Sequence, residues 1–283
     1  MDTTFKVVTK RITARANTPI NLWIFGDVHY DTSSCDRDRF DRFLKDAARD
    51  DKETTYYLGL GDYIDFASTS ENRILTDSKI HETTREKLDF IAQRDNRQFA
   101  QKIRQMHGRT LGLIHGNHGW LFQDGKNSTE DLAERMKTDY LGWLCYYHLI
   151  LEDTEGSDRR VCCVDLVMCH GKSGGKLMGT SINQVDDLRR IFPLADVYIM
   201  GHNHDRGAWP TDVLYYNPTA KKIKQKQQVF VRSGSFKKAY TEDTKGYEIG
   251  RLLRPANLGA VKLIITKRRM KDDTVSVDIN SYV

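Results

Sequence analysis

Asn21-Leu22-Trp23-Ile24-Phe25-Gly26-Asp27-Val28-His29 is the stretch that decides the fold. Its first five residues form a short apolar run with the length and make-up of a buried strand. Gly26 ends this run, and a carboxylate and an imidazole follow two residues apart. At the end of a strand, such a pair can supply one oxygen and one nitrogen ligand to the same metal ion. A single Asp-x-His is weak evidence, because these residues usually cap loops.

The same arrangement returns at the ends of four later apolar runs. The later motifs are Gly61-Asp62-Tyr63-Ile64-Asp65, Gly116-Asn117-His118, His170-Gly171 and Gly201-His202-Asn203-His204. Spacings of about 30 to 55 residues suit β-α-β or hairpin units between the motifs. Because ligands in α/β sheets sit outside the carboxyl ends of strands, we expect the five motifs to meet at one edge.

The candidate donors are oxygen and imidazole groups, with no thiolate among them. This mixture favours manganese, iron, zinc or nickel over calcium or a purely aqueous magnesium site. The set is too large for one ion, but two ions about 3.5–4 Å apart, bridged by a carboxylate and a hydroxide, would use all of it. Its members are Asp27, His29, Asp62, Asn117, His118, His170, His202 and His204.

In this order, the five motifs resemble those of the calcineurin-like dinuclear metallophosphoesterases, over about residues 20–204. The resemblance implies an α/β fold in which two mixed β-sheets pack as a sandwich flanked by helices, in four layers. It also implies two divalent metal ions, with Mn²⁺ as the first expectation and Zn²⁺, Fe²⁺ or Ni²⁺ as alternatives.

The resemblance also implies a role for each donor. One ion would be held by Asp27, His29, Asp62 and His204, and the other by Asp62, Asn117, His170 and His202, so that Asp62 bridges them. His118 matches the general acid that protonates the leaving oxygen. Val231-Arg232-Ser233-Gly234-Ser235 is similar to the small-residue strand that often follows Gly-His-x-His in this family.

The chain departs from the family at several positions. Gly119 stands where an acid commonly follows Gly-Asn-His, so Asp65 is the candidate to orient His118. The phosphoprotein phosphatase branch has Arg-Gly after the second Asp, whereas this chain has Phe66-Ala67. The arginines that clamp a phosphomonoester in that branch are therefore missing from their usual positions.

Positive charge is concentrated late in the chain. The net charge is +5, but residues 219–271 contain fifteen Lys or Arg and three acids, which is +12. Such a segment suits an anionic phosphate ester, nucleic acid included, if it lies beside the metal site. The alternative is a lysine-rich edge hairpin that avoids aggregation. Lys172 and Arg206 are further candidates for contact with substrate phosphate.

Composition and length suit one globular α/β domain over residues 1–283, with a basic, β-rich part from about residue 211. The five cysteines are odd in number and lack a Cys-x-x-Cys, which indicates reduced thiols. No signal peptide and no run of 18 apolar residues is present, so we expect a cytoplasmic protein without membrane contact.

Apolar periodicity predicts the elements around the motifs. Helices are expected over 36–51, 84–107, 128–137 with Ser128 as N-cap, and 181–192. Strands are expected over 3–12 as a sheet edge, 20–25, 54–60, 111–114, 143–151, 160–168, 196–200, 228–232, 261–266 and 274–279. The polar segment 68–82 is a candidate active-site loop. Trp120 and Phe122 could stack a base, but a core position is favoured.

These observations favour a metal-dependent phosphodiesterase that acts on nucleic acid or nucleotides by hydroxide attack between two metal ions. A phosphomonoesterase or phosphoprotein phosphatase is the first alternative. A binding or scaffold protein that keeps the fold without chemistry is the second.

Overall fold

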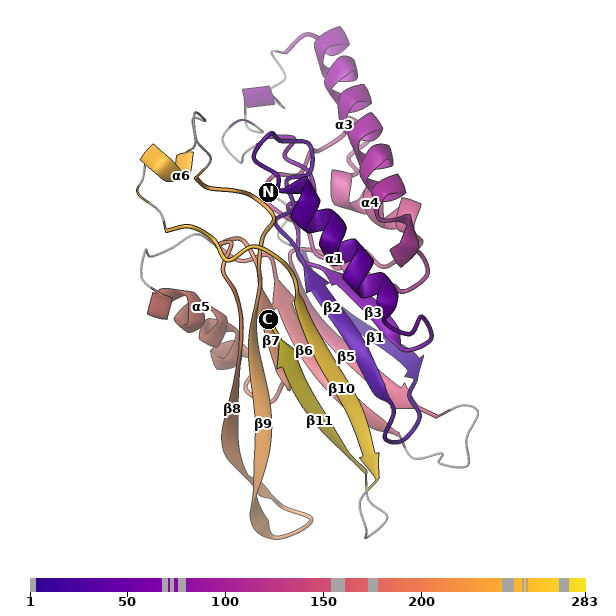
Figure 1. Cartoon of the computed structure of the whole chain (residues 1–283), viewed down its shortest axis with the longest axis vertical. Helices are drawn as coiled ribbons and strands as arrows, with labels where there is room; N and C mark the ends of the chain where they lie inside the picture. The colour runs from indigo at the N-terminus through magenta and orange to yellow at the C-terminus, as the bar shows by residue number, and fades with distance from the viewer. Residues whose placement is uncertain are drawn as a thin grey trace.

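Two mixed β-sheets pack face to face in this computed structural model, and helices cover both outer faces (Figure 1). The expected α/β sandwich is therefore confirmed. The structure describes residues 4–67, 71, 74–75, 80–153, 161–172, 178–240, 247–250, 252, 254–269 and 275–283. Most of the predicted loop over 68–82 lies outside the described residues.

One sheet has six strands in the order β1-β5-β6-β7-β9-β8. Their bounds are β1 Phe5–Thr13, β5 Leu144–Glu152, β6 Cys162–Cys169, β7 Val197–Met200, β9 Lys222–Ser233 and β8 Arg206–Asn217. β1 pairs in parallel with β5 and forms the expected edge. Strands β6, β7 and β9 run parallel to one another, so their carboxyl ends meet at one edge.

The other sheet has five strands in the order β11-β10-β2-β3-β4. Their bounds are β11 Val275–Tyr282, β10 Val261–Arg269, β2 Pro19–Phe25, β3 Thr55–Gly59 and β4 Thr110–Leu113. β2, β3 and β4 are parallel neighbours, which brings the residues after them to one edge.

Alternation along the strands builds the core on both sides of each sheet. Ile20, Leu22 and Ile24 of β2 belong to the apolar layer between the sheets. Trp23 and Phe25 point the other way, towards α1. β2 is thus buried on both faces, which explains its nearly continuous apolar run.

The helices divide between the two outer faces (Figure 1). α1 Arg37–Arg49, α3 Glu82–Lys102 and α4 Ser128–Met136 lie on the side of the five-stranded sheet, and η1 Arg104–Met106 follows α3. α5 Met178–Ile191 packs on β7 and β9, and α6 Tyr247–Gly250 is a single turn. No helix among the described residues is long and apolar enough to span a membrane.

Phenylalanine rings fix α1 against its sheet. Phe40 is fully buried, with its ring centroid 4.9 Å from that of Phe236 and 6.0 Å from that of Phe99. Asp36 caps the helix by accepting a hydrogen bond from the Arg39 amide. The helix that follows the first motif is therefore held at both its cap and its apolar face.

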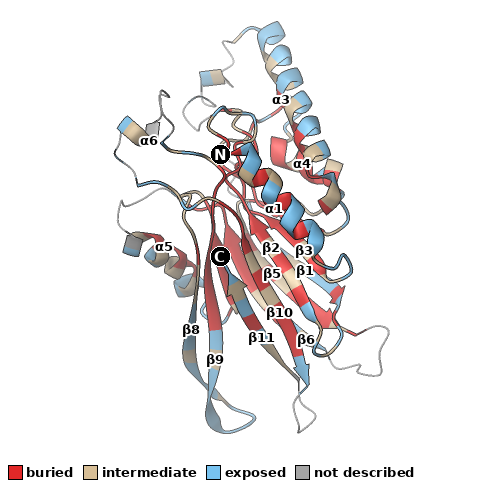
Figure 2. Ribbon diagram, in the orientation of Figure 1, coloured by how far each residue is buried: buried red, intermediate tan, exposed pale blue. Residues whose placement is uncertain are grey.

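Several details of the sequence prediction were wrong. The helix expected over 84–107 is α3, which ends at Lys102 and is followed by the separate turn η1. The N-cap of α4 is Asn127, which accepts from the amides of Thr129 and Glu130 in a capping box, and Ser128 is the first helical residue. Strand β8 was not predicted, and its partner β9 is longer than the expected 228–232. The two form a hairpin whose outer half is exposed (Figure 2).

Candidate metal centre

The five predicted motifs converge where the two sheets meet. Their side chains form three groups in which one ligand atom per residue lies within 4.8 Å of the others: Asp27, His29 and His204; Asp62, His170 and His202; and His29, Asp65 and His118. Asp27, Asp62 and Asn117 follow strands of the five-stranded sheet, whereas His170 and His202 follow strands of the six-stranded sheet. The cluster therefore exists only when the two sheets are packed together.

Asp62 lies at the junction of the groups. Its Oδ2 is 3.1 Å from His170 Nε2, 3.9 Å from His29 Nε2 and 4.0 Å from His118 Nε2. Its Oδ1 accepts a hydrogen bond from the His118 amide, with the two atoms 3.0 Å apart. The carboxylate is thus held in place by one oxygen and presents the other to three imidazoles, the geometry expected of a bridging ligand.

The group around Asp27 contains buried polar atoms without partners. Asp27 Oδ1 and both ring nitrogens of His29 are buried and make no hydrogen bond. His204 Nε2 is 3.6 Å from Asp27 Oδ1, and Asp27 Oδ2 accepts from the His202 amide at 2.9 Å. Unsatisfied buried polar atoms are costly, and a divalent cation among them would supply the missing interaction.

A backbone carbonyl orients the His170 ring from the side away from the centre. His170 Nδ1 donates to the Leu60 carbonyl at 2.7 Å, which directs Nε2 towards the centre. Asn117 Oδ1 lies 2.9 Å from this Nε2, and His202 Nδ1 lies 3.1 Å from it. The donors predicted for the second ion are therefore within reach of one point.

Asp65 connects two imidazoles at the edge of the cluster. It makes a short hydrogen bond with His118 Nδ1, and its Oδ2 is 3.2 Å from His29 Nδ1, although the latter contact lacks hydrogen-bond geometry. Both rings have Nδ1 towards Asp65 and Nε2 towards Asp62. This is the orienting position expected for Asp65.

The backbone at the candidate ligands is unusual. Nine described residues other than glycine have positive φ, and five of them are candidate ligands: Asp27, His29, Asp62, His202 and His204. A side chain in this region costs free energy, and such positions concentrate at functional sites. Gly116 allows a close approach, because a Cβ there would lie 2.1 Å from Asp62 Oδ1.

Burial and mutual charge shift the pKa values of the cluster. Burial lowers the pKa of His202 to about 4 and that of His204 well below its ordinary value, so both rings are neutral at pH 7, as metal ligands must be. Burial also raises the pKa of Asp27 to about 6. For His170, burial is outweighed by Asp62 and Asp27, which raise the pKa to about 9.

Asp62 and Asp65 keep their negative charge at neutral pH. Burial opposes ionisation of Asp62, but His170 and His29 hold its pKa well below the ordinary value. The pKa of Asp65 is also low, because His118 and His29 outweigh burial. The donor set, its charges and its orphaned atoms therefore fit divalent metal ions.

Lys172 and Arg206, the two residues predicted to contact substrate phosphate, lie outside the three groups. Lys172 is exposed, two residues after His170. Arg206 lies two residues after His204, but its guanidinium turns to the loop before β10 and donates to Asn257 Oδ1 at 3.1 Å. Their predicted contact with substrate stays a prediction.

Lys237 is a cation near the cluster that the sequence analysis did not single out. Its charge lowers the pKa of His118 and of His204. It follows Ser235, whose Oγ donates to the Asp27 carbonyl at 2.9 Å. The small-residue motif over 231–235 was the signal in the sequence that could have pointed to Lys237, because this motif leads the chain past the centre.

His115 and His148 lie outside the cluster, and Trp120 and Phe122 occupy the core position favoured by the sequence. His115 is buried against Thr129 Oγ1 at 3.2 Å, and His148 contacts Asp165 at 2.6 Å, so neither belongs to the cluster. Trp120 and Phe122 are buried and pack with Ala92. Their core position is confirmed.

Fold and site together define an α/β sandwich with clustered Asp, Asn and His donors at its strand ends. No protein-family model and no curated protein matches the sequence. Among solved structures, Vps29 from Chaetomium thermophilum is similar at 12% identity and a TM-score of 0.35, over 93% of this chain and 95% of that one.

Two further structures show comparable likeness. Wild-type Vps29 complexed with Zn²⁺ from Entamoeba histolytica has 11% identity and a TM-score of 0.38, over 93% of this chain and 99% of that one. A predicted phosphoesterase from Streptococcus pneumoniae TIGR4 has 14% identity and a TM-score of 0.31, over 94% and 100% of the two chains. Similarities of this size establish neither a family nor a function, so function has to be inferred from the site.

Proposed function

We propose that this protein is a metal-dependent phosphoesterase that acts on phosphodiesters of the nucleotide or nucleic-acid class. The observation that carries the proposal is the position of Asp62, whose Oδ2 faces His29, His118 and His170 at 3.1 to 4.0 Å. Those imidazoles come from three separate segments of the chain. A fold that only needed stability would gain little by burying so many titratable groups together.

Two divalent ions are assigned to this cluster. Asp27, His29, Asp62 and His204 would hold one ion, and Asp62, Asn117, His170 and His202 would hold the other. Ions bound there would lower the pKa of a shared water and offset charge on the phosphate oxygens. Manganese is the first expectation, and zinc, iron or nickel would suit the same oxygen and imidazole donors.

His118 is assigned as the general acid. Burial alone would lower its pKa, but Asp65 and Asp62 raise it above the ordinary value. More of the imidazole therefore carries a proton at neutral pH, and Asp65 holds the Nδ1 side so that Nε2 can donate. Proton transfer of this kind contributes about 10²–10⁴-fold to a rate.

The positions of the arginines support a diester over a monoester. Arg232 is fully buried and donates to the Ser181 and Gly201 carbonyls. Arg254 pairs with Asp205, and Arg206 turns towards Asn257. None of these three arginines is directed at the metal centre, where it could clamp the dianionic phosphate of a bound monoester, whereas a diester carries a single charge.

The test compares two substrates with one purified protein. With Mn²⁺, bis-p-nitrophenyl phosphate should be hydrolysed faster than p-nitrophenyl phosphate. Clearly faster turnover of the monoester would overturn the choice of diester and favour the phosphatase alternative. Binding of single-stranded DNA that weakens steeply with salt would support a nucleic-acid substrate over a small nucleotide.

Asp62→Asn separates an enzyme from a scaffold. The substitution keeps the shape and removes the bridging charge, so hydrolysis should fall to background while the fold, followed by circular dichroism, stays intact. Asp124→Asn, in the exposed turn before α4, is the control and should keep full activity. Undiminished turnover by Asp62→Asn would contradict the two-ion assignment.

A further inference from the structure

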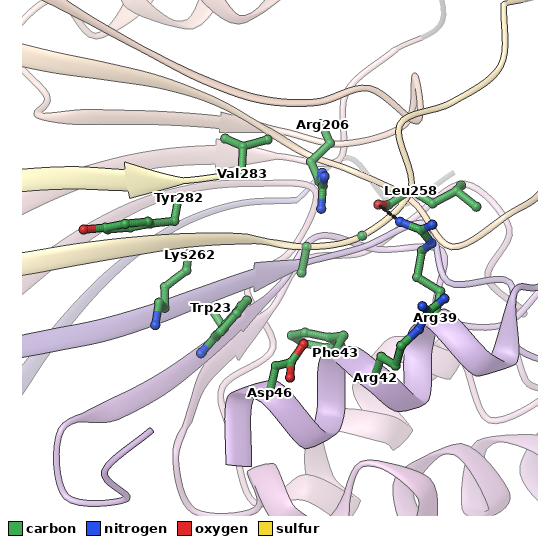
Figure 3. Close-up of a pocket in the computed structure, with 12 residues that line it drawn as sticks. Trp23, Arg39, Arg42, Phe43, Asp46, Arg206, Leu258, Lys262, Tyr282 and Val283 are labelled. Atoms are coloured by element: carbon green, nitrogen blue, oxygen red, sulfur yellow. Dashed lines mark hydrogen bonds between the residues drawn. The ribbon is translucent and has the colours of Figure 1, made fainter. Parts of the chain in front are cut away.

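A second cavity lies on the outer face of the five-stranded sheet, beside α1 (Figure 3). Its volume is about 340 Å³, within the range of small-molecule sites. A cross-strand row forms its floor, because Trp23 on β2 is in register with Lys262 on β10, which is in register with Tyr282 on β11. α1 packs on β2 through the contact of Phe43 with Trp23, and the cavity extends from there to Tyr282 on β11.

The wall of the cavity is rich in arginine. Arg39 and Arg42 come from α1, and Arg206 comes from the start of β8 (Figure 3). Arg39 donates to the Leu258 carbonyl at 3.1 Å, so its guanidinium is fixed beside the loop before β10. Arg206 reaches the same loop from the other side and lies against Gly259, where a Cβ would be 2.4 Å from its Nη1.

The arginine charges are poorly compensated. The Nε atoms of Arg39 and Arg206 are buried and make no hydrogen bond. Arg206 has Asn257 as its hydrogen-bond partner, and no carboxylate among the described residues pairs with it. Two cations that repel each other across a cavity would both be stabilised by an anion between them.

The side-chain carboxylates near the cavity are already paired. Asp46 lies 2.8 Å from Arg49, and Asp50 lies 3.1 Å from Lys262. Arg39 Nε is 3.8 Å from Asp36. Arg42 is exposed and has no ion-pair partner within the part of the chain that the structure describes. The cavity therefore keeps a surplus of positive charge from Arg42 and Arg206.

The floor adds aromatic surface to this charge. Trp23 packs edge-on against Phe43 at 5.5 Å and donates from Nε1 to Asp50, which fixes the indole. Tyr282 lies in the same floor row and is 59% exposed, so its ring is accessible to a planar ligand. Arginines bind phosphate through paired hydrogen bonds, and aromatic rings stack planar groups.

We propose that this cavity is a binding site for a nucleoside monophosphate, with the phosphate between Arg39, Arg42 and Arg206 and the ring system over Trp23 and Tyr282. The site is separate from the metal centre and does not depend on the proposed hydrolysis. Its backbone is nevertheless linked to that centre, because the Gly259 amide donates to the Ser235 carbonyl at 2.8 Å.

The test is calorimetric titration of adenosine 5′-monophosphate into EDTA-treated full-length protein, so that no metal ion can bind the phosphate. Binding should be saturable and should weaken with salt.

Arg206→Gln should weaken binding at least tenfold. Arg42→Gln should weaken it several-fold, and this exposed position keeps the test valid if loss of Arg206 disturbs the loop. Lys45→Gln removes the same charge from α1 outside the cavity and should change binding less than twofold.

Two simpler probes examine the class of ligand. Adenosine and inorganic phosphate should each bind at least tenfold more weakly than the monophosphate, since each lacks half of the contacts. The proposal is overturned if the monophosphate does not bind, or if Arg42→Gln and Arg206→Gln both bind it like the wild type. Inorganic phosphate that binds as tightly as the monophosphate would also overturn it. Since metal is absent throughout, these results are independent of hydrolytic activity.

Discussion

At the scale of single residues, the candidate centre depends on how closely Asp62 can approach its neighbours. Gly61 and Gly116 lie against it, and a Cβ at Gly61 would be 2.6 Å from His170 Nδ1. These glycines are part of the motifs because they leave room for the ligands. The positive φ of Asp62 is likewise sustained only by the packing around it.

Gly116→Ala should damage metal binding without touching a ligand. The new methyl group would lie 2.1 Å from Asp62 Oδ1, so the carboxylate must move. We expect an affinity for Mn²⁺ about 10–100-fold lower by calorimetry, the loss typical of disturbed ligand orientation. Gly179→Ala on α5 is the control, since a Cβ there meets nothing within 4 Å. Equal affinities in the two variants would contradict this account of Gly116.

His118→Asn should affect esters according to their leaving group. An alkoxide needs a proton as it departs, so an alkyl diester should lose about 10²–10⁴-fold in kcat. A p-nitrophenolate leaves without a proton and should lose much less. Asp65→Asn should follow the same pattern with a smaller loss, because it only weakens the orientation of the ring. The same loss for both leaving groups would exclude His118 as the acid.

Metal affinity should rise with pH. His170 must lose its proton to bind an ion, and Asp62 and Asp27 raise its pKa to about 9. Below pH 9, each unit of pH increases the deprotonated fraction, so affinity for the ion at His170 should rise about tenfold per unit between pH 6.5 and 8.5. Calorimetry in buffers of different ionisation enthalpy should detect about one proton released. Constant affinity over this range would contradict the charge state assigned to His170.

At the scale of elements, the β8–β9 hairpin places its lysines far from the candidate centre. Its basic residues Lys221, Lys222 and Lys224 lie at or near the tip, whereas Arg206 begins β8 beside His204 (Figure 1). Twelve residues of strand span about 40 Å at the usual rise. These lysines are therefore too far away to contact a phosphate bound among the clustered histidines.

Changing all three lysines to Gln should leave hydrolysis of bis-p-nitrophenyl phosphate nearly unchanged. Exposed charges at such a distance are screened by salt over about 8–10 Å. The measurement is kcat/KM at physiological ionic strength, with Lys45→Gln as a control for loss of charge elsewhere. A large fall in turnover of this small diester would show that the hairpin acts on the centre.

The sequence predicted elements where one physical signal dominated. β2, β3 and β7 are short apolar runs that end in glycine or a ligand, and their observed bounds agree with the prediction to within one residue at each end. β8 was missed because Pro210 interrupts its pattern and its outer half is not buried, so no apolar alternation marks it. The predicted N-cap of α4 was wrong by one residue because Asn127, Ser128 and Thr129 are all good cap residues.

At the scale of the whole molecule, the centre depends on the packing of the two sheets. Asp62 follows β3 of one sheet and His170 follows β6 of the other, yet their side-chain atoms are 3.1 Å apart. An ion shared by the two residues would join the sheets. The chain thus places its most polar buried groups where its two apolar layers end.

The clustering of the donors was predictable from the order of the motifs, and so was Asp65 as the partner of His118, but the other contacts were not. The support of His170 by the Leu60 carbonyl and the nearness of Lys237 are products of packing. The arginine-rich cavity was also invisible, because Arg39, Arg206 and Lys262 are far apart in the sequence and carry no motif.

The most direct test of the central claim is an anomalous-difference map from crystals of the protein grown with Mn²⁺. The account predicts two peaks about 3.5–4 Å apart. One should lie near Asp27, His29 and His204 and the other near Asn117, His170 and His202, with the Asp62 carboxylate between them. A single peak, or peaks that lie away from Asp62, would contradict it.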